Sequence, residues 1–176
     1  MVRTRVGYTG GQSQDPSYYS LGDHSEAIQI EFDPTKVSYD QLLGLAQRLG
    51  HFQGDDWSRQ YRSAVFYHSK TQRLAAEAQG IAKLEAVGTF TRAEDYHQKY
   101  YLQRSRVAKD FYARYPTARA FTDSLAVTKA NGILGGYVDS ERLQSLVPKL
   151  GVSDESASDL LEMKGRSIPG CSLPES

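Results

Sequence analysis

The sequence is poor in cysteine. Cys171 is the one thiol in 176 residues, so these residues can form neither an intrachain disulfide nor a cysteine-rich metal site. The four histidines lack the close spacing of metal ligands, and we predict no metal. A chain without disulfides is typical of a reducing compartment, so we expect a cytoplasmic protein. A targeting segment upstream of these residues stays open as an alternative.

No sign of charge dominates, and long apolar runs are missing. The chain has 21 basic and 21 acidic residues. A nucleic-acid binder, or a protein that binds anionic membranes, needs a concentrated basic surface, so we expect neither partner. No apolar run approaches the roughly 20 residues that a membrane-spanning helix needs. The length of 176 residues suffices for one sizeable core.

Two segments alternate apolar and polar side chains, which predicts half-buried strands at residues 2–8 and 26–32. In the second segment Glu26 shares its parity with Ile28 and Ile30, so its carboxyl should face the apolar side. Burial disfavours the charged form and would raise the pKa of this carboxyl, which suits a general acid. The structural alternative is that Glu26 lies in solvent at a frayed strand end.

A polar loop leads into a third predicted strand at residues 62–67. Its apolar residues fall on both parities, which is typical of a central strand covered on both faces. The loop carries Asp56 and Tyr61, and such loops often present polar groups to a ligand. The structural alternative is that Asp56 caps a turn and Tyr61 packs at the strand edge. For Tyr18, in an earlier loop, the sequence is consistent with either surface packing or a ligand role.

Three capping boxes predict helix starts, at Ser38-x-x-Gln41, Ser69-x-x-Gln72 and Thr91-x-x-Glu94, the last opening a helix to Tyr101. From about Arg104 every predicted element is helical, at residues 106–115, 117–130, 140–150 and 153–164. We therefore predict an α+β domain over residues 1–104 and a helical extension over 105–176. The last twelve residues are rich in Pro and Gly and should be mobile.

Six stretches of the first hundred residues, taken together, are similar to one known family. They are Thr4-Arg5-Val6-Gly7-Tyr8-Thr9-Gly10-Gly11, Pro16-Ser17-Tyr18, Gly22-Asp23-His24-Ser25-Glu26-Ala27, Phe32-Asp33-Pro34, Gln60-Tyr61-Arg62-Ser63-Ala64 and Ala93-Glu94-Asp95-Tyr96-His97-Gln98. In this order and spacing they resemble the A-type peptide methionine sulfoxide reductases, over about residues 2–103. The resemblance implies a two-layer α/β sandwich with a ferredoxin-like mixed sheet. The helices after Arg104 do not match the expected family pattern.

The resemblance also implies a chemistry. The family reduces the S epimer of methionine sulfoxide, free or in oxidised proteins, by thiolate attack on sulfur, and thioredoxin reduces the resulting disulfide. It implies no bound cofactor. A buried glutamic acid and two tyrosine hydroxyls bind the sulfoxide oxygen in the family. Matched residue by residue, these are Glu26, Tyr18 and Tyr61, and Asp56 matches the aspartate of the substrate pocket.

One part of the family pattern is not in these residues. The family's nucleophile lies in a Gly-Cys-Phe-Trp segment, a helix's length before the stretch that begins here at Thr4. We therefore expect the sheet to lack its first strand and helix, and the chain as written to be inactive. Loss of a strand exposes a sheet edge, which predicts marginal stability, partnering or a longer natural chain. Cys171 is either an idle thiol or a relic of a resolving cysteine.

Two alternatives to a reductase follow from these residues. The chain could be a pseudoenzyme that binds methionine sulfoxide without turnover. It could instead act through the helices after Arg104 as an interaction module, with the α+β domain as a carrier.

Overall fold

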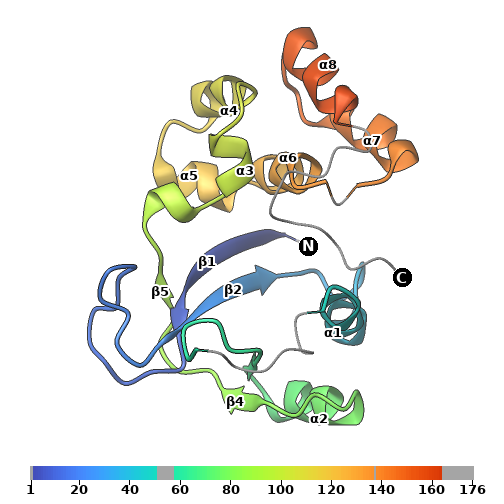
Figure 1. Ribbon diagram of the computed structural model, residues 1–176. Helices are drawn as coiled ribbons and strands as arrows, with labels where there is room; N and C mark the ends of the chain where they lie inside the picture. Colours follow the sequence, from blue (N-terminus) through green and yellow to red (C-terminus); the bar gives the residue numbers. More distant parts are fainter. Residues whose placement is uncertain (1, 51–57, 137, 164–176) are drawn as a thin grey trace. The chain divides into compact units, whose positions relative to one another are not determined.

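The computed structural model describes residues 2–50, 58–136 and 138–163 (Figure 1). Contacts divide them into two units, which are considered separately. The first unit is Val6–Glu94, and the second contains Val2–Arg5 and the described residues from Asp95 onward. Strand β1 (Arg3–Thr9) contributes residues to both. The division falls between Glu94 and Asp95, earlier in the chain than the predicted boundary at 104/105.

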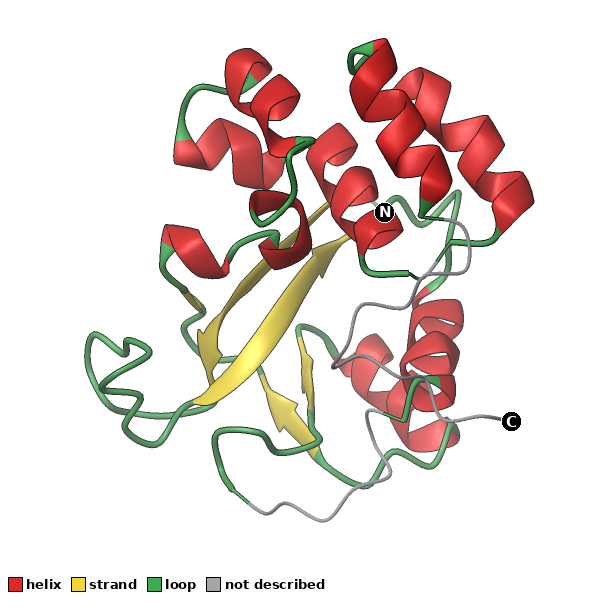
Figure 2. Cartoon of the chain, turned by 45° about the horizontal axis from the view of Figure 1, so that its top comes forward, coloured by secondary structure: helices red, strands yellow, loops and turns green. Residues whose placement is uncertain are grey.

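The described strands form two small sheets, drawn in yellow in Figure 2. The three-stranded sheet has the order β2-β1-β5, with β2 at Ser25–Glu31 and β5 at Thr91–Arg92. Strands β1 and β5 are antiparallel, with Gly7 opposite Arg92. The second sheet pairs β3 (Val65–Tyr67) in parallel with β4 (Leu84–Ala86). The structure is therefore of the predicted α+β class.

The prediction of a central strand at residues 62–67 is wrong. Extended pairing begins only at Val65, and within the described residues β3 pairs with β4 alone. The residues before it turn first, because the N–H of Tyr61 donates to the carbonyl of Ser58 over 3.3 Å. The side chain of Val65 is buried, as predicted, whereas Phe66 is only half-buried.

Two capped helices complete the first unit. Helix α1 (Tyr39–Arg48) has the predicted capping box, in which Ser38 and Gln41 bond each other's backbone N–H groups. Helix α2 (Lys70–Ala78) begins after Ser69, whose side chain accepts from the N–H of Gln72. The two helices share a small core with β3, made of Leu43, Val65, Ala76 and Ile81. Packing of this core holds β3 and the loop before it in place.

The third predicted capping box does not start a helix. Thr91 lies in β5, opposite Tyr8 of β1, and this pairing outweighs the local capping signal. A short 3₁₀ helix follows at Asp95–His97, and α3 begins only at Tyr100 and ends at Gln103. Lys99 between them is left-handed, with φ 53° and ψ 47°, so the predicted continuous helix is broken there.

Apart from Val2–Arg5, the regular elements of the second unit are helical, as the patterns after Arg104 predicted. Its remaining elements are α4 (Ala108–Arg114), α5 (Ala118–Asp123), α6 (Leu125–Leu134), α7 (Ser140–Leu146), a 3₁₀ turn at Val147–Lys149 and α8 (Asp154–Glu162). The predicted helix at 117–130 is two helices, because Ser124 ends α5 and caps α6. Buried residues from α3 through α8, including Leu102, Phe111, Ile133 and Leu160, form one continuous core.

A buried lysine ties the start of β1 to this helical core. Lys99 is 5% exposed, and its Nζ donates to the carbonyl and hydroxyl oxygens of Thr4 and to the hydroxyl of Thr128, at 2.6–2.8 Å. Asp123 accepts nearby from Arg5 over 2.7 Å and from Arg3 over 3.2 Å. Burial is the main cause that lowers the pKa of Lys99 to about 8.

No helix in residues 2–50, 58–136 and 138–163 combines the length and the apolar character needed to cross a membrane.

Candidate functional site

The first residues of β2 are hydrogen-bonded to the loop that precedes β3. The hydroxyl of Ser25 donates to the carbonyl of Arg59 over 2.7 Å, and the N–H of Glu26 donates to the carbonyl of Gln60 over 2.9 Å. Arg62, from the same loop, also bonds to Ser25: its Nε donates to the Ser25 hydroxyl over 2.6 Å. Residues 59–62 are therefore fixed against the strand that carries Glu26.

Two arginines bind this loop to the glycine-rich loop after β1. Arg59 donates through Nε to the carbonyl of Asp23 over 2.6 Å. Arg62 pairs with the Glu85 carboxylate and reaches the carbonyl of Gly10. Gly10 has φ +81°, and a Cβ there would lie 2.4 Å from Nη2 of Arg62. A glycine is needed at this position, since a side chain would meet both strain and the guanidinium.

Gln60 brings two of the predicted site residues to one point. Its side-chain Nε2 donates to Oε1 of Glu26 over 2.7 Å and to the hydroxyl oxygen of Tyr61 over 2.9 Å. Sequence reasoning did not single out Gln60. The available signal was its place directly before Tyr61 in one of the six family-like stretches.

The predicted burial of Glu26 is wrong. Its parity with the isoleucines is as predicted, but Glu26 is exposed and Ile28 is 60% exposed. The reason is that this face of β2, an edge strand of the sheet in the described residues, borders an open pocket instead of a packed core. The carboxyl is therefore accessible to a ligand and lacks the buried setting that the strand pattern suggested.

Tyr18 is placed by a carboxylate at the end of β5. Glu94 accepts from the backbone N–H of Tyr18 over 3.0 Å through Oε1, and from the hydroxyl of Tyr8 over 2.7 Å through Oε2. The ring of Tyr18 meets that of Tyr19 edge-to-face, with centroids 5.3 Å apart. Glu94 thus links the loop that carries Tyr18 to β1, a role that sequence reasoning missed.

The hydroxyl of Tyr61 has a raised pKa. Partial desolvation is the main cause, and the charges of Glu26 and of Tyr18 add to it. Tyr61 therefore stays protonated through neutral pH and can act as a hydrogen-bond donor. Tyr18 and Glu26 are thus both near enough to Tyr61 to influence its hydroxyl.

Hydrogen bonds between its own residues hold the conformation of the loop between β1 and β2. The Asp23 carboxylate accepts from the N–H groups of Gln12 and Ser13 over 2.9 Å and from the Ser13 hydroxyl over 2.7 Å. These bonds, chiefly the Ser13 hydroxyl, hold the pKa of Asp23 far below its usual value. Buried His24 accepts from the N–H of Gly11 at Nδ1, so its Nε2 donates to the Ser13 carbonyl over 2.9 Å. His24 is a structural residue of this loop.

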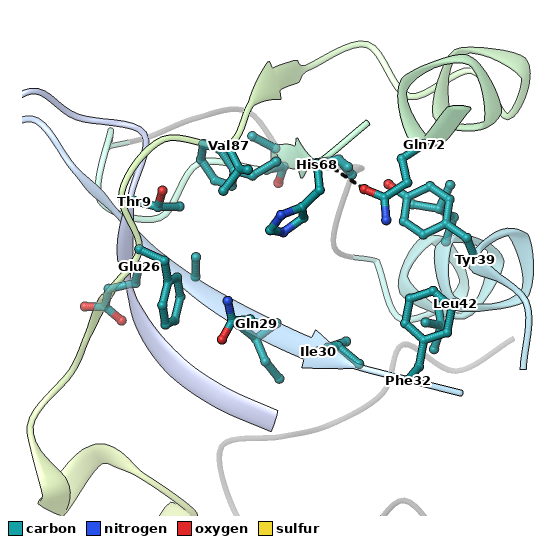
Figure 3. A pocket seen from close by; sticks show the side chains of 18 of the residues that line it. Thr9, Glu26, Gln29, Ile30, Phe32, Tyr39, Leu42, His68, Gln72 and Val87 are labelled. Carbon is teal, nitrogen blue, oxygen red and sulfur yellow. Dashed lines mark hydrogen bonds between the residues drawn. The ribbon is translucent and has the colours of Figure 1, made fainter. Parts of the chain in front are cut away.

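A pocket of about 330 Å³ lies beside the site, between β2 and the α1/β3 layer (Figure 3). Ile30 and Phe32 line it from β2 and the segment that follows, and Tyr39 and Leu42 line it from α1. Glu26 stands at one end, with its carboxylate directed away from the pocket. The hydroxyl of Tyr39 is buried and has no hydrogen-bond partner within the described residues. The pocket is mainly apolar, and the polar site lies at its rim.

Two of the predicted site residues, Asp56 and Cys171, lie outside the described residues. Within residues 2–50, 58–136 and 138–163 no cluster of His, Cys, Asp or Glu side chains could hold a metal ion.

The arrangement presents hydrogen-bond donors beside an apolar pocket. Two tyrosines and a carboxyl, with an amide between two of them, suit a ligand that has a strong oxygen acceptor and an apolar part. The fold and the site therefore define an α+β domain with a polar cluster at the rim of an apolar pocket.

Comparison with known proteins identifies the family. The family model described as peptide methionine sulfoxide reductase matches residues 1–129, and the chain belongs to this family. The match passes the limit near residue 103 that the sequence motifs suggested. The prediction that the helices after Arg104 fall outside the family is therefore wrong for α4, α5 and part of α6.

Several relatives carry the same name. The peptide methionine sulfoxide reductase of Drosophila melanogaster is 32% identical over 167 residues, which cover 87% of this chain and 67% of the fly protein. An MsrA of Methanothermobacter thermautotrophicus is 38% identical over 122 residues, covering 57% of this chain and 72% of the relative. The match to peptide methionine sulfoxide reductase A5 of Arabidopsis thaliana, 37% identical, spans about half of that relative, 48%.

Proposed function

We propose that this protein recognises methionine S-sulfoxide in oxidised proteins through Tyr18, Glu26 and Tyr61. The observation that carries the proposal is the bridge from Gln60 to both Glu26 and Tyr61, which holds a carboxyl and a phenol at one point. A sulfoxide oxygen is a strong acceptor without a proton of its own. The Tyr61 hydroxyl would donate to it, Tyr18 would add a second donor, and the Glu26 carboxyl would lie beside the bound group.

Reduction of the bound sulfoxide requires a thiol in addition to these donors. In the family's reaction a cysteine thiolate attacks the sulfoxide sulfur and the oxygen takes up protons. The oxygen ends on the cysteine as a sulfenic acid and the thioether leaves, so that thiol plus sulfoxide gives sulfenic acid plus thioether. A second thiol converts the sulfenic acid to a disulfide with loss of water, and thioredoxin would then reduce the disulfide. Hydrogen bonds to the oxygen stabilise the charge that develops there.

The 176 residues contain one thiol, at Cys171, and no Gly-Cys-Phe-Trp segment. We therefore propose that the chain of these residues recognises the sulfoxide without reducing it. Asp56, outside the described residues, is proposed as a further contact to the substrate. Thioredoxin is proposed as the reductant for a form of the protein that carries the nucleophile.

Removal of the Tyr61 hydroxyl should weaken binding of the sulfoxide. In a calorimetric titration with an acetylated tripeptide centred on methionine S-sulfoxide, Tyr61→Phe should bind about tenfold more weakly, because one hydrogen bond is lost. Glu26→Gln should also weaken binding, since it removes the carboxyl that Gln60 holds in place.

Tyr19→Phe is the matched control, because it removes the same hydroxyl from a tyrosine that is 90% exposed and next to Tyr18. It should bind the peptide as the unmodified chain does. Equal affinity of Tyr61→Phe and Tyr19→Phe would contradict the proposed site.

A further inference from the structure

Gln60 lies between the two residues on which the proposed function depends. Its Nε2 is 2.7 Å from Oε1 of Glu26 and 2.9 Å from the hydroxyl oxygen of Tyr61. A primary amide nitrogen carries two hydrogens, so it can make both bonds at the same time. Gln60 is therefore a shared partner of the carboxyl and the phenol.

These bonds determine which atoms of the pair are directed to a ligand. A phenol oxygen that accepts from Gln60 directs its own O–H toward another group. In Glu26 the amide occupies Oε1, so Oε2 is the oxygen that remains open to a ligand. A sulfoxide oxygen accepts hydrogen bonds and donates none, so its recognition needs the Tyr61 O–H as a donor.

Without the amide, the two groups would bond each other. A phenol O–H donates strongly to a carboxylate. Glu26 is close enough that its charge contributes to the raised pKa of Tyr61. A direct bond between them would use the Tyr61 hydrogen that the sulfoxide requires, and Gln60 prevents this by supplying the hydrogens to both oxygens.

The main chain fixes the origin of the Gln60 side chain. Its carbonyl accepts from the N–H of Glu26 over 2.9 Å. On one side Arg59 accepts from the Ser25 hydroxyl, and on the other Arg62 donates to it. The amide is therefore held in register with β2, as a positioning role demands.

We propose that Gln60 is a positioning residue of the sulfoxide site, which keeps the Tyr61 O–H from bonding to the Glu26 carboxylate and directs it toward the sulfoxide oxygen. The inference rests on the proposed function. It assigns to Gln60 a hydrogen-donating task, which is distinct from filling space.

The replacement Gln60→Glu tests this task, because it keeps the shape of the side chain and makes hydrogen donation depend on pH. At about pH 7.5 the new carboxylate cannot donate and repels Glu26, so binding of the S-sulfoxide tripeptide should fall at least tenfold. At about pH 5 a carboxyl whose pKa is raised by its neighbour carries a proton, and affinity should return toward the unmodified value. Gln60→Met, which cannot donate at any pH, should bind weakly at both.

Gln41→Glu is the matched control, since Gln41 lies in the capping box of α1, where glutamate serves equally well. The other charged groups around the pair, Arg59, Arg62, Glu94 and Asp23, and the buried His24, are the same in all variants. Their titration therefore cancels when each variant is compared with the unmodified chain at the same pH.

The outcomes separate the inference from the function on which it rests. If the unmodified chain binds and Gln60→Glu shows the same affinity and pH profile as Gln41→Glu, Gln60 has no positioning role. Loss of binding in Gln60→Glu at both pH values would likewise overturn it, as a shape effect. If the unmodified chain does not bind the sulfoxide, the proposed function fails, and the inference fails with it. Should Gln60→Glu not fold, as judged by circular dichroism, unchanged affinity of Gln60→Met would still overturn the inference.

Discussion

The purified 176-residue chain is expected to leave dabsylated methionine S-sulfoxide unreduced in the presence of dithiothreitol. The physical reason is that hydrogen bonds to the oxygen lower the barrier only when a thiolate attacks the sulfur. The one cysteine of these residues, Cys171, lies in a segment rich in Pro and Gly and outside every family-like stretch. The amount of dabsyl-methionine, separated by chromatography, should equal that of a protein-free reaction.

Cys171→Ser provides the control for this result. The variant removes the one thiol, so its background should match that of the unmodified chain if Cys171 has no part in reduction. Formation of dabsyl-methionine above the protein-free rate would contradict the expectation. Its loss in Cys171→Ser would then identify Cys171 as the nucleophile.

Buried Lys99 should make the free energy of unfolding depend on pH above neutrality. Burial lowers its pKa from 10.5 to about 8 in the folded chain. Between these values the unfolded chain holds a proton that the folded chain has lost, so stability increases as pH rises. Relative to Lys99→Met, the unmodified chain should gain about 3 kcal/mol in the free energy of unfolding between pH 8 and pH 10.5.

The measurement is urea unfolding of both proteins over this pH range. Taking the difference removes the titration of the tyrosines, which the two proteins share. Lys70→Met is the matched control, since Lys70 is exposed at the first position of α2. Its difference from the unmodified chain should be flat with pH. If the difference in the free energy of unfolding for Lys99→Met is also independent of pH, burial does not disfavour the charged form of Lys99 in the folded chain.

Local signals in the sequence predicted local structure well. The capping box at Ser38 and Gln41 formed as expected, because both partners lie within one turn. Alternation located β1 and β2 to within about a residue, since the period of two is a property of the strand itself. The helices after Arg104 were also predicted, because a helical pattern is likewise a property of the segment itself. The cap at Ser124 divided one of these predicted helices into two.

Failures occurred where a distant partner decided the outcome. Thr91 carries a helix-start signal, but its pairing opposite Tyr8, more than eighty residues earlier, places it in a strand. Glu26 has the parity of a buried residue, but burial depends on what covers the strand, and β2 is an edge strand of the described sheet. Neither fact can be read from a window of a few residues.

The candidate site, like the fold, was predicted only in part. Spacing alone could not place Tyr18, Glu26 and Tyr61 together, because they come from a loop, a strand and a second loop. The family resemblance named these three residues, and in the structure Gln60 joins Glu26 to Tyr61 while Tyr18 is near enough to Tyr61 to influence its hydroxyl. Gln60 and Glu94, which position them, were missed because their partners lie 34 and 76 residues away in the chain.

The central claim is that the chain recognises the oxygen of methionine S-sulfoxide. The most direct measurement is a calorimetric titration of the unmodified chain with three acetylated tripeptides that differ only at the central residue: methionine S-sulfoxide, methionine R-sulfoxide and methionine. The S-sulfoxide peptide should bind at least about tenfold more tightly than the methionine peptide, because it alone presents an acceptor to the Tyr61 hydroxyl in the expected geometry. The R-sulfoxide peptide should bind more weakly than the S epimer, since its oxygen points away from this donor. Equal affinity for all three peptides, or binding of none, would contradict the account.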